Sequence, residues 1–219
     1  MLQPAEFIPV AGRTGHILAL GQWVLDRACR QLKSWRDEGI APPLLAVNVA
    51  LGELRHGQEF VKRVAETLAK WDVSPDQLEL DVTELILAET TFAQNDALEQ
   101  LRRLGVRLAI DDFGTQYSSL EYLRSYRISR LKIAQSILGM AAAGDPGGVA
   151  MVRAMTGIAR ELGVEIMAQG VETKEQRDFL MRSEATSKAQ GYYFSRPLAA
   201  EQAEEMLRRG RLDAPHDPG

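Results

Sequence analysis

The feature that most constrains this sequence is its alternation of helix-like and strand-like patterns from one end to the other. Residues 16–38 place apolar side chains at helical spacing, and Gly39 follows them as a stop signal. Further helices are expected near 57–70, 92–104, 118–126, 148–162 and 199–209, and Thr173 with Gln176 has the spacing of a helix capping box. Strands are expected near 44–49, 78–83, 106–110, 128–133, 164–168 and 190–194.

Strands that alternate with helices predict an α/β fold with parallel strands joined by right-handed crossovers. A doubly wound sheet and a TIM-type (β/α) barrel both satisfy this pattern. Polar residues at the carboxyl ends of successive strands favour the barrel, because barrel enzymes build their sites there. Only six strands are expected, so the barrel would lack two. The domain is expected over residues 1–209, with a disordered tail at 210–219.

Composition limits the classes of function. Lys and Arg together number 26 and Asp and Glu 30, so the net charge is -4, which argues against binding of a nucleic acid polymer. Cys29 is the single cysteine and fits a reducing compartment. The sequence shows no apolar run of membrane-spanning length and no signal-peptide pattern at its start. A cytoplasmic protein without membrane association is therefore expected.

Polar residues recur at matching positions of the expected strands. Side chains alternate between the two faces of a strand, so residues of equal parity share a face. Alone, each has an ordinary explanation as a turn, capping or solvated residue. Together they predict a shared polar site that consists of Asn48, Asp81, Asp111, Lys132 and Gln169.

The residue types in this set suggest metal-assisted phosphate chemistry. Carboxylate and amide oxygens with no histidine nearby suit Mg²⁺, Mn²⁺ or Ca²⁺ better than zinc. A lysine beside paired carboxylates can stabilise phosphoryl charge or orient a metal-bound water. The chemistry expected is attack of water on a phosphate ester.

The run DDFGTQYSSL at residues 111–120 resembles the signature loop of the EAL family, usually written DDFGTGYSSL. Other segments follow in the family's order: PAEFIP at 4–9, VNV at 47–49, DVTE at 81–84, LKI at 131–133, GVET at 170–173 and QGY at 190–192. The chain is thus similar to the EAL family over nearly its whole length, up to about Leu207.

The resemblance implies a (β/α)₈ barrel in which two divalent ions, Mg²⁺ or Mn²⁺, support hydrolysis of cyclic di-GMP to linear pGpG. By resemblance, the metal ligands are Asn48, Asp81, Asp111 and Asp112, and the catalytic positions are Lys132, Gln169 and Glu172. Gln190, Phe7 and Pro9 would line the nucleotide site, and Glu84, with Glu172, would support the signature loop. The Asp111–Leu120 region would contribute to a homodimer interface.

The sequence also departs from the family pattern. The Glu-Ala-Leu segment that names the family is expected before Pro4 and is absent from this sequence, so the domain is expected to be incomplete at its N-terminus. Asp81 and Gln169 stand where the family has glutamates, and Ala134 where it has an aspartate. Loss of a proton-transfer group typically lowers the rate by about 10²–10⁴.

These departures predict a degenerate EAL domain that acts as a non-hydrolytic nucleotide receptor or as an interaction module. Three alternatives remain open at this point. They are an impaired metal-dependent phosphodiesterase, a protein-binding module with no nucleotide ligand, and a fragment that does not fold alone.

Overall fold

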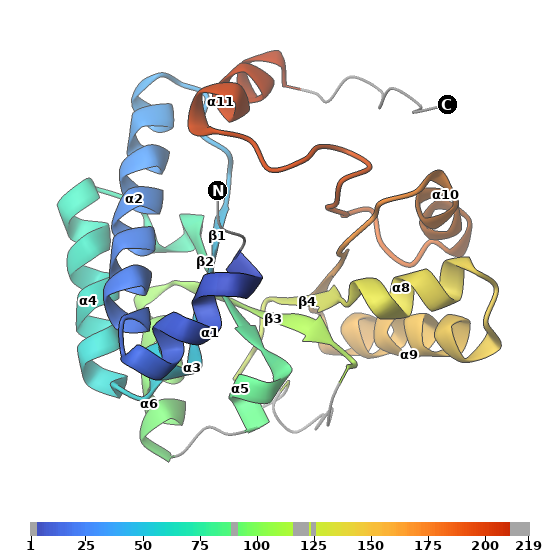
Figure 1. Cartoon of the computed structure of the whole chain (residues 1–219), viewed down its shortest axis with the longest axis horizontal. Coiled ribbons are helices and arrows are strands. Elements are labelled where there is room, and N and C mark those ends of the chain that lie inside the picture. Colours follow the sequence, from blue (N-terminus) through green and yellow to red (C-terminus); the bar gives the residue numbers. More distant parts are fainter. Residues whose placement is uncertain (1–3, 89–91, 116–122, 124–125, 211–219) are drawn as a thin grey trace. The chain divides into compact units, whose positions relative to one another are not determined.

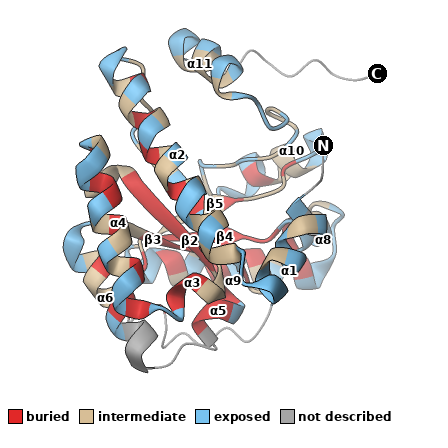
Figure 2. Ribbon diagram, turned by 60° about the vertical axis from the view of Figure 1, so that its left-hand side comes forward, coloured by how far each residue is buried: buried red, intermediate tan, exposed pale blue. Residues whose placement is uncertain are grey.

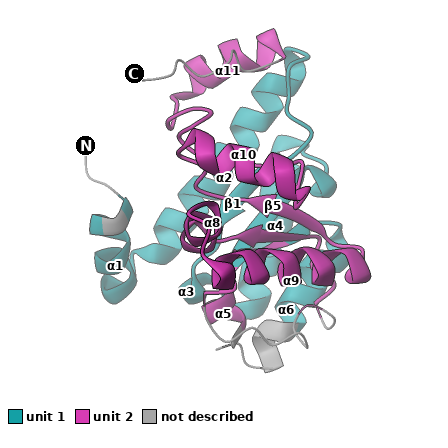
Figure 3. Cartoon of the chain, turned by 90° about the vertical axis from the view of Figure 1, so that its right-hand side faces the viewer, with its two compact units in different colours: residues 1–82, 89–108 teal, residues 83–88, 109–219 magenta. Residues whose placement is uncertain are grey.

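The structure is a computed structural model that describes residues 4–88, 92–115, 123 and 126–210. The chain divides into two compact units (Figure 3). Unit 1 comprises Met1–Val82 and Glu89–Leu108, and unit 2 comprises Thr83–Ala88 and Ala109–Gly219. The units are described separately below.

Unit 1 is built from helices packed around a pair of parallel strands. Its elements are α1 (Pro4–Thr14), α2 (Ile17–Asp37), β1 (Leu45–Asn48), α3 (Leu51–Leu54), α4 (Gly57–Trp71), the 3-10 turn η1 (Pro75–Gln77), β2 (Leu78–Thr83, whose last residue belongs to unit 2) and α6 (Phe92–Leu104). Strand β1 pairs with β2 in parallel, from Leu45 opposite Leu78 to Asn48 opposite Asp81. Helix α4 packs against both α2 and α6 (Figure 1).

The core of unit 1 follows from the apolar stripes of its two longest helices (Figure 2). One stripe repeats at the three- and four-residue spacing that keeps side chains on one helical face. Full burial of a valine, leucine or phenylalanine side chain contributes about 1.5–3 kcal/mol to the free energy of unfolding, relative to leaving it exposed. The buried residues of α2 and α4 include Leu25, Cys29, Leu32, Phe60, Val64 and Leu68.

Unit 2 places helices against the remaining parallel strands. Its elements are α5 (Glu84–Ala88), β3 (Arg107–Phe113, which enters the unit at Ala109), β4 (Arg130–Ile133), α8 (Gln135–Ala142), α9 (Pro146–Leu162), β5 (Glu165–Ala168), α10 (Lys174–Ser183) and α11 (Ala200–Arg209). Strand β4 pairs in parallel with β3 and with β5. Helix α9 packs on β4 and β5 and lies beside α8 (Figure 1).

Local signals explain where the helices of unit 2 begin and end. The Asp145 carboxylate accepts a hydrogen bond from Gly148 N at 2.7 Å at the start of α9, and Gly163 ends that helix in the left-handed conformation. At the start of α10, Thr173 Oγ1 accepts from Gln176 N at 3.3 Å, and Gln176 Oε1 accepts from Thr173 N at 3.1 Å. The capping box predicted from the sequence is therefore confirmed.

The α/β pattern with parallel strands is confirmed, and most expected elements lie within two residues of their predicted bounds. The expected strand at 190–194 is wrong. The chain there makes only an isolated parallel bridge between Ala168 and Ala189. It then turns, because the amides of Phe194 and Ser195 donate back to Gly191 O at 3.0 and 3.3 Å.

Four helices were not anticipated, namely α1, α3, α5 and α8. Helix α1 contains Pro9, which donates no backbone hydrogen bond. The expected helix at 118–126 falls mostly outside the described residues, as does the tail apart from Gly210. None of the described helices combines the length and the apolar character needed to cross a bilayer.

Candidate functional site

In unit 1, two of the predicted site residues are direct neighbours on paired strands. Asn48 and Asp81 occupy opposite register positions of β1 and β2, and Val49 N donates to Asp81 O at 2.9 Å just beyond them. Residues at one register position of neighbouring strands share a face. Asn48 is exposed whereas Asp81 is 6% exposed. An amide oxygen and a carboxylate are thus held side by side at the ends of two strands.

A buried glutamate, which sequence reasoning missed, supports the chain just after Asn48. Glu53 Oε2 accepts from Ala50 N at 3.1 Å, and the side chain is 5% exposed. Burial raises the pKa of Glu53, against the opposing effects of the Ala50 hydrogen bond and the Arg63 charge. A Cβ atom added to Gly21 of α2 would lie only 2.0 Å from the Glu53 carboxylate. The available signal in the sequence was Gly21, a glycine in the middle of a long helix.

In unit 2, the Asp111–Asp112 pair forms a β-bulge opposite Lys132. Ile110 of β3 pairs with Leu131 of β4, and Phe113 pairs with Ile133. Two residues of β3 therefore stand opposite the single residue Lys132 of β4. The bulge brings both aspartates to one register position, whereas simple alternation would have separated them.

The electrostatics of the bulge reflect two adjacent carboxylates. Burial raises the pKa of Asp112, and the charge of Asp111 raises it further. Asp112 N donates to Asp111 Oδ1 at 3.1 Å, and Asp112 has a left-handed backbone with φ of 52°. Two carboxylates crowded in this way favour a cation beside them.

Glu84 connects the start of α5 to the signature loop. Its side chain is 3% exposed, and Gly114 N donates to Glu84 Oε2 at 3.3 Å. This is the contact that a loop-supporting role requires. Of the predicted dimer region, Asp111–Thr115 lies within the described residues and 116–120 does not.

The ends of β4 and β5 bring further predicted residues together. Lys132, which is 2% exposed, stands opposite Met167, and Gln169 N donates to Ile133 O at 3.1 Å. Gln190 N donates to Ala168 O at 2.9 Å. The backbone of Gln190 therefore runs beside that of Gln169 at the end of β5.

Three predicted residues lie apart from these contacts. Glu172 is exposed just before α10, and the hydrogen bond described for it is the donation of its backbone N to Gln176 Oε1 at 2.6 Å. Phe7 and Pro9 lie on α1 in unit 1, whereas Gln190 lies in unit 2. A common nucleotide site for Phe7, Pro9 and Gln190 stays a prediction, as does the convergence of all five strand-end side chains.

A cluster of three charged side chains in unit 2 includes the first residues of β4 and β5. Arg130 of β4 and Lys188 contact the Glu165 carboxylate of β5 at 2.7 and 2.9 Å. Partial burial alone would raise the pKa of Glu165, but the hydrogen bonds from Arg130 and Lys188 outweigh it and lower the pKa to about 2. The group ties β4 and β5 to the segment that leads into Gln190.

The donor chemistry of both units fits a divalent metal ion. Asn48 and Asp81 in unit 1, and Asp111 and Asp112 in unit 2, offer only amide and carboxylate oxygens, which are the ligands of Mg²⁺ and Mn²⁺. Within the described residues, no group of three His, Cys, Asp or Glu side chains is arranged as a metal cluster. Each unit therefore offers a pair of oxygen donors.

Comparison with known proteins gives one consistent family. The sequence model of the EAL domain matches residues 1–197. The chain is 40% identical over 202 residues to the bifunctional diguanylate cyclase/cyclic di-GMP phosphodiesterase MucR of Pseudomonas aeruginosa, covering 92% of this chain and 29% of that protein. It is 39% identical over 214 residues to the cyclic di-GMP phosphodiesterase NbdA of the same organism, covering 98% of this chain and 27% of that protein.

A solved structure agrees with these matches. The MucR phosphodiesterase in complex with c-di-GMP superimposes with a TM-score of 0.86 at 40% identity, covering 92% of this chain and 81% of that one. The chain spans under a third of the length of the two curated relatives. Phosphodiesterases of the EAL type depend in general on metal ions.

Proposed function

Because the chain belongs to the EAL domain family, we propose that it binds cyclic di-GMP in bacterial signalling, as a receptor or interaction module with little or no hydrolysis. The relatives that carry phosphodiesterase names, and the c-di-GMP complex of MucR, support this choice of ligand. The observation that carries the proposal is the bulge that sets Asp111 and Asp112 opposite Lys132.

The residues around the bulge supply what binding of a metal and a phosphate diester requires. Asp111 and Asp112 would hold a Mg²⁺ or Mn²⁺ ion, as would the pair Asn48 and Asp81. The metal would polarise a phosphate oxygen and make a bound water more acidic. Lys132 would hold the attacking water or a phosphoryl oxygen through its ammonium group.

Hydrolysis also needs a group that takes a proton from water, and Gln169 does not provide one. Its amide oxygen can accept a hydrogen bond or bind a metal, but an amide is not a base at neutral pH. Glu172 has a carboxylate, yet its side chain is exposed before α10. Asp81 is shorter than glutamate by about 1.5 Å, the length of one C–C bond. The residues that would bind a metal ion or a phosphate are therefore retained better than a group that would accept a proton from water.

The second candidate function is an impaired metal-dependent phosphodiesterase that produces pGpG. The contact of Glu84 with Gly114 N favours it, because this contact would support the signature loop. A homodimer through the Asp111–Leu120 region and a protein partner are further parts of this proposal. Cyclic dinucleotide signalling would place the chain in the cytoplasm, where the Cys29 thiol stays reduced.

One preparation tests binding and hydrolysis together. Calorimetry with cyclic di-GMP in Ca²⁺ measures binding, and chromatography after incubation with Mg²⁺ or Mn²⁺ measures pGpG. We expect binding without appreciable pGpG. Rapid production of pGpG would overturn the receptor proposal in favour of the enzyme. Absence of binding under every metal condition would leave the protein-binding module and the fragment that does not fold alone, and a cooperative melt followed by far-UV circular dichroism would exclude the fragment.

Gln169→Glu tests the stated reason for the missing turnover. If the amide limits proton transfer, the variant should raise the rate of pGpG formation by about 10²–10⁴ while cyclic di-GMP affinity changes little. Gln169→Asn is the matched control, because it changes the side chain without adding a base. An equal rise in both variants would contradict the proton-transfer argument.

A further inference from the structure

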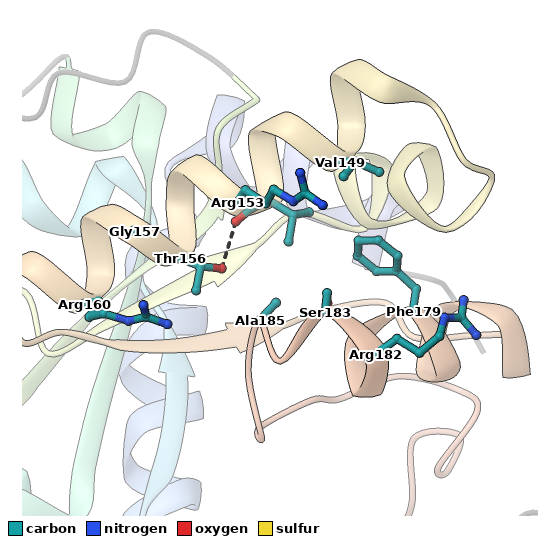
Figure 4. A pocket seen from close by; sticks show the side chains of 10 residues that line it. Val149, Arg153, Thr156, Gly157, Arg160, Phe179, Arg182, Ser183 and Ala185 are labelled. Atoms are coloured by element: carbon teal, nitrogen blue, oxygen red, sulfur yellow. Dashed lines mark hydrogen bonds between the residues drawn. The ribbon is translucent and has the colours of Figure 1, made fainter.

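A cavity of about 390 Å³ lies in unit 2 between α9 and α10, away from the strand-end residues described above (Figure 4). Arg153 and Arg160 line it from α9, and Phe179 and Arg182 line it from α10. The Phe179 ring points across the gap toward α9 (Figure 4). Cavities of about 300–1,000 Å³ are the usual size of sites for small molecules.

The lining of this cavity is positively charged. Its described lining contains three arginines and no carboxylate. In the part of the chain that the structure describes, Arg153, Arg160 and Arg182 make no ion pair. Several arginines elsewhere are paired, as Arg102 is with Glu99 at 2.7 Å. The guanidinium groups of the cavity therefore keep their hydrogen-bond donors for another partner.

A cavity in unit 1 shows the contrast. It measures about 450 Å³ and is lined by Asp26 and Glu66 as well as by Arg63 and Lys70. Lys70 Nζ lies 2.6 Å from Asp26 Oδ1, so the chain itself neutralises charge there. In the unit 2 cavity an anion must come from outside.

The lining also indicates the kind of anion. Guanidinium groups bind phosphate oxygens through paired, charge-assisted hydrogen bonds. The Thr156 hydroxyl already donates to Val152 O at 2.8 Å, so the arginines are the main donors (Figure 4). The Phe179 ring offers a surface on which an aromatic base can stack. We propose that this cavity, the α9–α10 site, binds a small phosphate-bearing ligand of nucleotide size.

The α9–α10 site is separate from the proposed site for cyclic di-GMP hydrolysis or binding. None of the residues placed at the strand ends of unit 2, such as Lys132 and Gln169, lines it. Both helices pack within unit 2, with α9 on β4 and β5. A ligand here would contact α9, which packs directly on these two strands, and this is where an effector would act.

The first test uses the whole chain and three probes. Calorimetry should detect binding of inorganic pyrophosphate and of GMP, and no binding of guanosine, which lacks the phosphate. Affinity should fall as salt is added, because charge attraction is screened. The titrations are repeated with saturating cyclic di-GMP, and binding of the probes should persist.

Two variants locate the binding. Gly157→Glu places a carboxylate in the cavity, and a Cβ there meets nothing within 4 Å, so the variant should fold. Gly139→Glu in α8 is the matched control, with the same charge change at an equally open position outside the cavity. We expect Gly157→Glu to weaken GMP binding about tenfold or more, and Gly139→Glu to leave it unchanged.

Arginine substitutions complete the test. Arg153→Gln and Arg182→Gln should each weaken binding about tenfold, whereas Arg27→Gln, at an exposed arginine of α2, should not. The proposal is overturned if no phosphate probe binds, if all variants bind alike, or if cyclic di-GMP displaces the probes. Binding of an acidic peptide without binding of pyrophosphate or GMP would also overturn it and would point to a protein partner. These outcomes are independent of whether cyclic di-GMP is hydrolysed.

Discussion

Gly191 is the position where a single added methyl group should be least tolerated. A Cβ atom there would lie 2.2 Å from Val171 O and 2.3 Å from Val171 N, far inside van der Waals contact. Both atoms belong to the backbone, so no side-chain rotation relieves the overlap. Val171 N also donates to Gln190 O at 3.0 Å, and Tyr193 N donates to Val171 O at 2.9 Å. Gly191→Ala must therefore push apart two hydrogen-bonded segments.

The magnitude follows from these contacts. Overpacking costs about 1–3 kcal/mol, and each weakened backbone hydrogen bond costs about 1 kcal/mol, so the free energy of unfolding should fall by roughly 3 kcal/mol. For a chain of this size each 1 kcal/mol lowers the melting temperature by about 2–4 °C, which gives a decrease of about 6–12 °C. Because Gln190 precedes the glycine, cyclic di-GMP affinity should fall as well.

Thermal melts followed by circular dichroism measure the effect. Gly139→Ala is the control, because its added Cβ meets nothing within 4 Å in α8 and should stabilise the helix by about 1 kcal/mol. The two variants add the same methyl group and should shift the melt in opposite directions. A Gly191→Ala protein with the same melting temperature as the parent would refute the claim that Gly191 approaches the Val171 backbone so closely.

Three further predictions concern charges and the thiol. Glu165→Gln should lower the free energy of unfolding at pH 7 by about 1 kcal/mol, since the carboxyl is 38% exposed and screened. In the parent this stability is present above about pH 4.5 and is lost as pH falls toward 2, because the folded-state pKa of Glu165 is lowered. Glu99→Gln should cost less, because Glu99 pairs with Arg102 and Arg103 of its own helix, whereas Glu165 joins separate elements. Asp112→Asn should raise the melting temperature in chelator by removing repulsion from Asp111, and Mg²⁺ should stabilise the parent more than this variant. Burial raises the pKa of Cys29 to about 11, with a smaller effect from a nearby carboxylate, so a thiol reagent at pH 8 should label Cys29 only as fast as the native chain opens; rapid labelling would contradict this burial.

The sequence was informative where a repeating pattern reports burial. The buried stripe of α2 and the capping box of α10 could be read directly, because helical spacing and capping side chains act locally. The neighbouring positions of Asn48 and Asp81 could also be predicted from strand parity. The family followed from ordered motifs spread over most of the chain, which the EAL match over residues 1–197 confirms.

The sequence was less informative where tertiary contacts decide the structure. Alternation fails at the bulge, which needs a partner strand to reveal that Asp111 and Asp112 share the position opposite Lys132. The segment after Ala189 has the composition of a strand but turns because Gly191 approaches Val171. The short helices α3 and α5 depend on tertiary packing, since so few residues cannot form a stable helix alone.

Gln169, which stands where the family has a glutamate, differs from the retained bulge and Gly191 turn in how it is held in the fold. The bulge and the Gly191 turn are fixed by backbone pairing, so losing them would require the fold to change. Gln169, by contrast, differs from glutamate only at the end of its side chain, while its backbone N stays bonded to Ile133 O at 3.1 Å. A carboxylate introduced at Gln169 would therefore start from the same backbone position as the amide it replaces. If the proposed receptor lacks turnover because of this amide, one substitution at Gln169 should restore part of it, whereas loss of the bulge could not be repaired by exchanging a single side chain.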